Sequence, residues 1–192
     1  MKNLFISTAL LLAPCFASAH YIDFHGGSAY GHVTNTQNTG NKIGYHAGIS
    51  MGTQLDPNIR VEIEATYRKN TTKNKYVYSD LDVLKSKTHS SSNSWAYMAN
   101  AYFDIDTLRY KSIIPYIGAG VGYCNNEIRN KVTTTIASHE AKERDERFAY
   151  QGIVGARYAY TPEVSIALQY HYFCGKAHTK DHSFGLHLAK HF

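Results

Sequence analysis

After its first twenty residues the chain has no long apolar run. No later segment approaches the roughly 18 apolar residues that a membrane-spanning helix needs. The mean hydropathy of −0.38 also excludes a helical membrane protein. It does not exclude a β-barrel, because strands that alternate apolar and polar residues average out in a hydropathy profile. The length of 192 residues fits one domain.

The N-terminal segment has the layout of a secretory signal peptide. Lys2 is followed by an apolar stretch, Leu4–Ala13, and Ala17-Ser18-Ala19 forms a cleavage site that predicts a signal over 1–19 and a mature chain over 20–192. A lipoprotein signal ending at Cys15 is the alternative. Pro14 disfavours it, because a small flexible residue is expected before the lipidated cysteine.

The rest of the chain consists of short segments in which apolar and polar residues alternate with a period of two, which is typical of strands. Eight such segments predict an all-β fold, an eight-stranded antiparallel up-and-down transmembrane β-barrel. Glycines alternate with apolar residues in one segment, where we expect them to make room for long side chains from the opposite wall. The segments are Tyr21–Tyr30, Lys42–Thr53, Ile59–Arg68, Trp95–Ile105, Pro115–Cys124, Tyr150–Tyr160, Val164–Tyr172 and Ser183–Phe192.

The connections alternate strictly between short and long. Short turns are expected at 54–58, 106–114 and 161–163, and long polar loops at 31–41, 69–94, 125–147 and 174–182. Membrane barrels show this asymmetry because one end faces the periplasm and the other projects outward. The last strand ends on Phe192 with no charged edge, so we expect it to close the barrel against the first strand.

Alternation alone does not say which face of the strands points inward. A lipocalin is also a secreted eight-stranded barrel, but its apolar face lines a cavity and its polar face meets water. The aromatic terminal strand, the loop asymmetry and the aromatic residues at strand ends favour the membrane form. The 16 tyrosines suit the boundary between lipid and water.

The chain resembles the opacity and surface-antigen families of OmpA-like eight-stranded outer-membrane barrels. The resemblance spans the mature chain and is most specific at Ile59–Tyr67, Pro115–Gly122, Ala149–Gly152 and Phe192. It implies a bacterial outer-membrane protein in contact with lipid and lipopolysaccharide, assembled by the barrel-assembly machinery through its C-terminal strand. The sequence departs from the families' pattern at His171, where an Arg is common, and at Lys190, where an apolar or aromatic residue is usual.

Charged residues on the strands predict a polar interior. Arg60, Glu62, Glu64 and Arg157 are expected to meet inside the barrel, where buried charges must pair or hydrogen-bond, together with Gln151 and His171. Two close carboxylates can in principle do acid–base work. We interpret the set as a network that fills the lumen, since an eight-stranded interior is just wide enough for side chains. A narrow porin is the alternative.

The sequence predicts no catalytic residue, no metal site and no cofactor. Lipid A deacylases of the outer membrane use a strand-borne His followed two residues later by Ser, whereas His171 is followed at that offset by Phe173. Cys174, His178 and His182 contain zinc-ligand types but lie in an expected loop.

A disulfide between Cys124 and Cys174 is left open. An oxidising compartment permits it. One strand separates theirs, so the backbones lie about 10 Å apart unless the loops bend inward.

The expected loops are the candidate binding surface. Residues 69–93 hold five lysines against Asp80 and Asp82, and residues 125–147 carry Glu140 and Arg144 at helical spacing. A basic outward loop can bind lipopolysaccharide, or host-cell and matrix ligands that are anionic; nucleic acid is not expected. The sequence thus predicts a bacterial outer-membrane surface protein whose barrel presents loops for adhesion, with a narrow porin or a lipid A-modifying enzyme as alternatives. The loop candidates are Lys69, Lys73, Lys75, Lys85 and Lys87.

Overall fold

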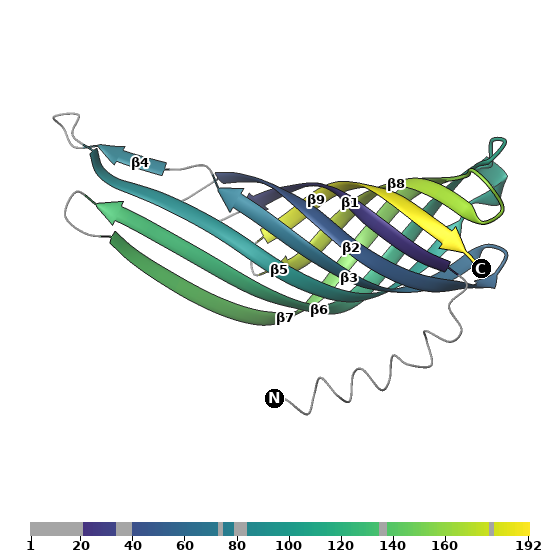
Figure 1. Cartoon of the computed structure of the whole chain (residues 1–192), viewed down its shortest axis with the longest axis horizontal. Helices are drawn as coiled ribbons and strands as arrows, with labels where there is room; N and C mark the ends of the chain where they lie inside the picture. The colour runs from purple at the N-terminus through teal and green to yellow at the C-terminus, as the bar shows by residue number, and fades with distance from the viewer. Residues whose placement is uncertain (1–20, 34–39, 73–74, 79–83, 135–137, 177–178) are drawn as a thin grey trace, which may run out of the picture.

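The chain folds into a closed barrel of antiparallel strands (Figure 1). The computed structural model describes residues 21–33, 40–72, 75–78, 84–134, 138–176 and 179–192. Eight strands form the barrel, and the short strand β4 adds to the edge of β5. The strands are β1 (Tyr21–Val33), β2 (Gly40–Asp56), β3 (Ile59–Thr72), β4 (Lys75–Tyr78), β5 (Leu84–Asp104), β6 (Ile113–Thr134), β7 (Ser138–Ala159), β8 (Val164–Lys176) and β9 (Thr179–His191).

The barrel has up-and-down topology, in which the eight barrel strands pair in chain order and β3 pairs with β5 past the short strand β4. β1 pairs with β9 from Tyr21↔His191 to Val33↔Thr179, so the last strand closes the barrel against the first, as predicted. The turn between β5 and β6 contains a 3-10 helix, η1 (Asp106–Leu108). Among the described residues, no helix is long and apolar enough to cross a membrane.

The alternation of side chains separates an apolar outside from a polar inside. Outward side chains such as Phe24, Val121 and Leu186 are exposed, whereas Arg60, Glu64 and other polar residues are buried in the lumen. This arrangement is the reverse of a lipocalin, and it suits a barrel whose outer face meets lipid. The exposed apolar residues of this belt include Phe24, Ile49, Tyr97, Phe103, Ile117, Val121, Val154, Leu168, Leu186 and Leu188.

The expected long loops are, in large part, continuations of the strands. β6 and β7 remain paired from Asn125↔Glu146 to Thr133↔Ser138, across a segment expected to be a loop. β5 likewise begins at Leu84 rather than near Trp95. The prediction of loops was therefore wrong here, because it relied on apolar alternation, which stops where the strands leave the lipid although backbone pairing continues. The helical spacing of Glu140 and Arg144 was also misleading, since β7 runs through both.

The glycines of β6 do make room for long side chains, but these side chains come from neighbouring strands rather than from the opposite wall. A Cβ at Gly120 would clash with Asn100 Oδ1 and would lie 3.2 Å from Gln151 Cγ. These residues belong to the two strands directly paired with Gly120, β5 and β7. Glycine therefore makes room for side chains from adjacent strands rather than from the opposite wall.

The two ends of the barrel differ. Tyr21 and His191 pair at the end that also carries the short turns, which we call the terminal end. At the other end, the far end, β5, β6 and β7 extend well beyond the remaining strands (Figure 1). These three strands have 21, 22 and 22 residues. A membrane-crossing strand needs only about 9–11, so roughly half of each lies outside the apolar belt.

Candidate functional site

The lumen near the terminal end is filled by an ion network centred on Asp104. Arg60 donates to Asp104 Oδ1 through Nε at 3.2 Å and Nη2 at 3.1 Å, and Arg157 Nη2 donates to Oδ2 at 2.6 Å. Arg60 also lies 3.5 Å from Glu62, whose carboxylate accepts the Tyr21 hydroxyl at 2.6 Å. Two buried guanidinium groups thus share one carboxylate. Loss of any of the three would leave a buried charge without its ion-pair partner.

A second layer surrounds Glu64 in the middle of the barrel. Asn100 Nδ2 donates to Glu64 at 2.7 Å, Gln151 Nε2 donates at 3.0 Å, and the Thr66 hydroxyl donates as well. His171 Nδ1 lies 3.4 Å from Gln151 Oε1. The contacts join β3, β5, β7 and β8 across the lumen. A carboxylate with three donors is fully hydrogen-bonded and leaves little space beside it.

A third layer lies towards the far end. The Arg68 guanidinium sits 4.1 Å above the ring of Phe173 and donates to Ser183 Oγ at 3.4 Å. Asn70 Nδ2 donates to Asp181 at 3.2 Å. Arg68, Asn70 and Asp181 are all almost completely buried. The three layers together occupy the lumen from one end of the apolar belt to the other.

Histidines line another part of the same lumen. Asp23 and His25 on β1 and His187 on β9 lie in direct contact, and the rings of His46 and His171 lie 6.1 Å apart nearby. His25 and His187 are paired across the β1–β9 seam. Alternation in the sequence puts Asp23 and His25 on the polar face of the first strand and His187 on that of the last strand. It does not give the register that brings the three together.

The projecting hairpin of β6 and β7 carries an outward charge cluster. Glu127 contacts Arg129 at 2.7 Å, Lys142 at 3.0 Å and Arg144 at 3.3 Å. Hydrogen bonds from Lys142 and Arg129 lower the pKa of Glu127 to about 2, so it is ionised. Glu146, which accepts hydrogen bonds from Tyr123 and Asn125, adjoins the cluster on the same face. Three cations against two carboxylates leave a net charge of +1 on this face, which we call the β6–β7 basic patch. It lies just beyond Tyr123 and Phe148, at the limit of the apolar belt.

The structure places the six residues expected in the interior network within the lumen. It divides them between two layers: Arg60, Glu62 and Arg157 lie in the first, and Glu64, Gln151 and His171 in the second. Arg157 reaches Asp104 rather than either glutamate. Sequence reasoning missed Asp104 as the shared partner, although its position on the polar face of a strand was visible.

The expected loop lysines lie on strands where the structure describes them. Lys69 belongs to β3, Lys75 to β4, and Lys85 and Lys87 to β5, whereas Lys73 lies outside the described residues. Pairing of Tyr76 with Lys87 and of Lys75 with Thr88 brings β4 and β5 together. The lysines therefore share one end of the barrel with the β6–β7 basic patch.

The cysteine and histidine motif of the last hairpin is not assembled into a site. Among the residues with described positions, Cys124 and Cys174 are not joined by a disulfide; the Cys124 thiol donates to Asn126 Oδ1 at 3.3 Å. His182 Nδ1 instead lies 2.5 Å from the Tyr170 hydroxyl. His178 lies outside the described residues.

A closed barrel with an apolar exterior and a charged, filled interior is an outer-membrane β-barrel. The sequence matches the outer membrane protein beta-barrel domain over residues 6–192, and the chain belongs to that family. It is a protein of the bacterial outer membrane, as predicted. The terminal end is therefore periplasmic and the far end faces outward.

Individual relatives are distant. An uncharacterized protein of Brucella abortus (strain 2308) is 27% identical over 148 residues, which cover 68% of this chain and 51% of the relative. The chain thus spans about half the length of the curated relatives it matches. Neisserial surface protein A has a similar structure, with a TM-score of 0.55, 16% identity, and coverage of 89% of this chain and 97% of that one. Ail, the attachment invasion locus protein of Yersinia pestis, gives a TM-score of 0.51 at 11% identity, covering 91% and 99%.

Proposed function

We propose that the protein is a surface adhesin whose plugged barrel anchors projecting hairpins that bind anionic ligands on host cells or matrix. The observation that carries the proposal is the paired extension of β6 and β7, which bears the β6–β7 basic patch beyond the apolar belt. Paired strands hold their side chains in place more firmly than a loop does, so binding costs less conformational entropy. The name of the Yersinia pestis protein, attachment invasion locus, agrees with such a role for a barrel of this fold.

The filled lumen argues against the narrow-porin alternative. Side chains from opposite parts of the wall meet at Glu64 and at Asp104, where an ion would have to pass. An eight-stranded barrel has little interior left once such layers are in place. The barrel thus serves as a scaffold in this proposal, and binding belongs to its outer end.

The enzyme alternative lacks the serine that a deacylase places two residues after its histidine. Ser183, the cross-strand partner of His171, is completely buried and accepts a hydrogen bond from Arg68. Phe173 points into the lumen and is buried at the offset where a deacylase would have serine. A serine–histidine contact does occur, with Ser165 Oγ 2.9 Å from His191 Nε2. It lies at the periplasmic end, away from the outer leaflet that holds lipid A.

Replacing Lys69, Lys73, Lys75, Lys85 and Lys87 together with glutamine is expected to weaken adhesion about fivefold. Exposed ion pairs are each worth roughly 0.2–1 kcal/mol, and five at the low end sum to about 1 kcal/mol, which is about fivefold in affinity. Binding of cells that display the protein to immobilised host cells or matrix measures the effect. Binding of the parent should also fall with added salt.

The matched control replaces Lys111 and Lys190 with glutamine. Both lie at the periplasmic end, so these changes alter net charge without touching the outer surface. A second variant also replaces the three cations of the β6–β7 basic patch, Arg129, Lys142 and Arg144, with glutamine. Adhesion that stays at the parental level in this second variant, or that falls equally in the control, would refute the adhesin proposal.

A further inference from the structure

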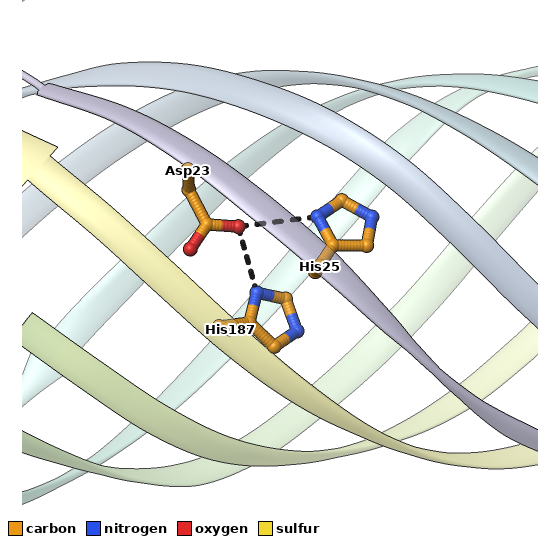
Figure 2. Close-up of side chains that lie close together, drawn as sticks. All are labelled: Asp23, His25 and His187. Atoms are coloured by element: carbon orange, nitrogen blue, oxygen red, sulfur yellow. Dashed lines mark hydrogen bonds and ion pairs between the residues drawn. The ribbon is translucent and has the colours of Figure 1, made fainter.

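Asp23, His25 and His187 form a compact buried cluster at the seam between the first and last strands (Figure 2). His25 Nδ1 lies 3.1 Å and His187 Nδ1 2.8 Å from the same oxygen, Asp23 Oδ1. The three side chains are 4–7% exposed, and their potential ligand atoms all lie within 4.8 Å of one another. Figure 2 shows both rings turning their Nδ1 edges towards the carboxylate.

The hydrogen bonds around His25 fix where its proton resides. Thr66 has one hydroxyl hydrogen, which it donates to Glu64. The Thr66 oxygen must therefore accept from His25 Nε2, 2.9 Å away. In a neutral His25, Nδ1 then turns a lone pair towards the carboxylate of Asp23. A cation between the two, either a second ring proton or a metal ion, makes this contact favourable.

Further ring nitrogens in the lumen lack partners. His187 Nε2, His171 Nε2 and both nitrogens of His46 are buried without a hydrogen-bond partner among the described residues. The His171 ring lies 5.8 Å from that of His187, and the His46 ring lies 6.3 Å from that of His25. Buried polar atoms are rarely left unpaired in folded proteins, so this part of the lumen offers polar sites for water or an ion beside the cluster.

Glycines on nearby strands leave room for these rings. A Cβ at Gly48 would lie 2.5 Å from His25 Nε2, and a Cβ at Gly185 would lie 2.9 Å from His46 Nε2. Both glycines face the lumen, and a side chain at either would displace an imidazole. The positions of the histidines therefore depend on several strands.

We propose that Asp23, His25 and His187 bind one divalent transition-metal ion, of the Zn²⁺ class, inside the barrel. Imidazole with carboxylate is a donor set that zinc accepts. Neighbouring ligand atoms of tetrahedral zinc lie about 3.3 Å apart when the bonds are about 2.0–2.1 Å. The Nδ1–Oδ1 distances of 2.8 and 3.1 Å need to open by only a few tenths of an ångström.

The surroundings of the cluster fit this assignment. Zinc-binding histidines commonly donate their second ring nitrogen to an oxygen acceptor, as His25 does to Thr66, which is held in turn by Glu64. A small cavity of about 20 Å³ adjoins Asp23 and His187 and is also lined by Tyr21 and His191 at the periplasmic end. The arginines that also line it, Arg60 and Arg157, are paired with Asp104. A metal here links β1 to β9 and ties the two ends of the chain together.

The proposal is tested by titrating the full mature chain with Zn²⁺ after it has been folded in detergent micelles. Calorimetry should show one ion per barrel. Asp23→Asn and His187→Gln should each weaken binding at least about tenfold. His182→Gln is the matched control: it removes another β9 histidine, one bonded to Tyr170 rather than to the cluster, and should leave the affinity unchanged.

Heat-modifiable migration on a gel shows whether each variant folds. If neither variant folds, X-ray absorption of the zinc-loaded parent decides, with two imidazoles and a carboxylate oxygen at about 2.0–2.1 Å expected. A parent that binds no stoichiometric zinc, a spectrum without imidazole, or binding that survives both Asp23→Asn and His187→Gln would overturn the site. Surviving binding would place the ion elsewhere, for example at the mature N-terminal His20.

Discussion

Replacing Asp104 with alanine is expected to lower the free energy of unfolding by about 3–5 kcal/mol, the range for removing one partner of a buried ion pair. Asp104 is 2% exposed and accepts hydrogen bonds from both Arg60 and Arg157. Without it Arg157 has no other carboxylate within salt-bridge distance among the described residues. Arg60 keeps the longer contact to Glu62, at 3.5 Å, an interaction with Tyr21, and its stacking on Tyr102 and Tyr116.

Asp106→Ala is the matched control for this substitution. Asp106 also pairs with an arginine, Arg109 at 2.7 Å, but the two side chains are 38% and 50% exposed. Exposed pairs contribute about 0–1 kcal/mol, so the control should behave almost like the parent. Denaturant unfolding in lipid vesicles, followed by the fluorescence of Trp95, measures both. Equal effects of the two substitutions would mean that Asp104 does not hold an interior network together.

Replacing Leu186 with arginine is expected to cost about 2–4 kcal/mol, the range for a basic residue on the lipid face near the bilayer midplane. Leu186 lies between Phe184 and Leu188 on the outward face of β9 and is 64% exposed on the isolated barrel. In water, an exposed leucine could be replaced by arginine at little cost. The destabilisation therefore measures contact with lipid directly.

Leu108→Arg provides the comparison at equal exposure. Leu108 is also 64% exposed, but it lies in η1, in a turn at the periplasmic end. Its replacement should change the free energy of unfolding by less than about 0.5 kcal/mol. The same vesicle experiment measures both variants. A lipocalin-like protein, whose outer face meets water, would tolerate both substitutions equally.

The sequence predicted only those parts of the strands that cross the membrane, because contact with lipid on one face makes apolar and polar residues alternate there. Ile59–Arg68 alternates cleanly because one face meets lipid and the other meets the polar lumen, and the structure has β3 there. Beyond the apolar belt the outward residues of β6 and β7, such as Arg129 and Lys142, are polar and exposed. Inward residues such as Ser92 and Asn126 are polar as well, although they are buried. With polar residues on both faces, the sequence no longer alternates and does not reveal the strand.

The interior partners were harder to predict than the strands. Alternation identifies Asp104 and Arg157 as polar-face residues, but their contact depends on the relative stagger of β5 and β7, which are separated by β6. The same holds for His187 and Asp23, 164 residues apart in sequence. Which residues face each other across the lumen depends on the register of every strand pair in the barrel. The alternation within one segment does not give that register.

Recording from planar lipid bilayers with the purified, folded protein tests most directly whether the barrel is a plugged scaffold. The layers around Asp104, Glu64 and Arg68 occupy the lumen along the apolar belt. We expect a silent bilayer, with no discrete current steps at voltages that the bilayer itself withstands. Reproducible single-channel steps from the parent protein would contradict the account, because ions would then pass where these side chains meet.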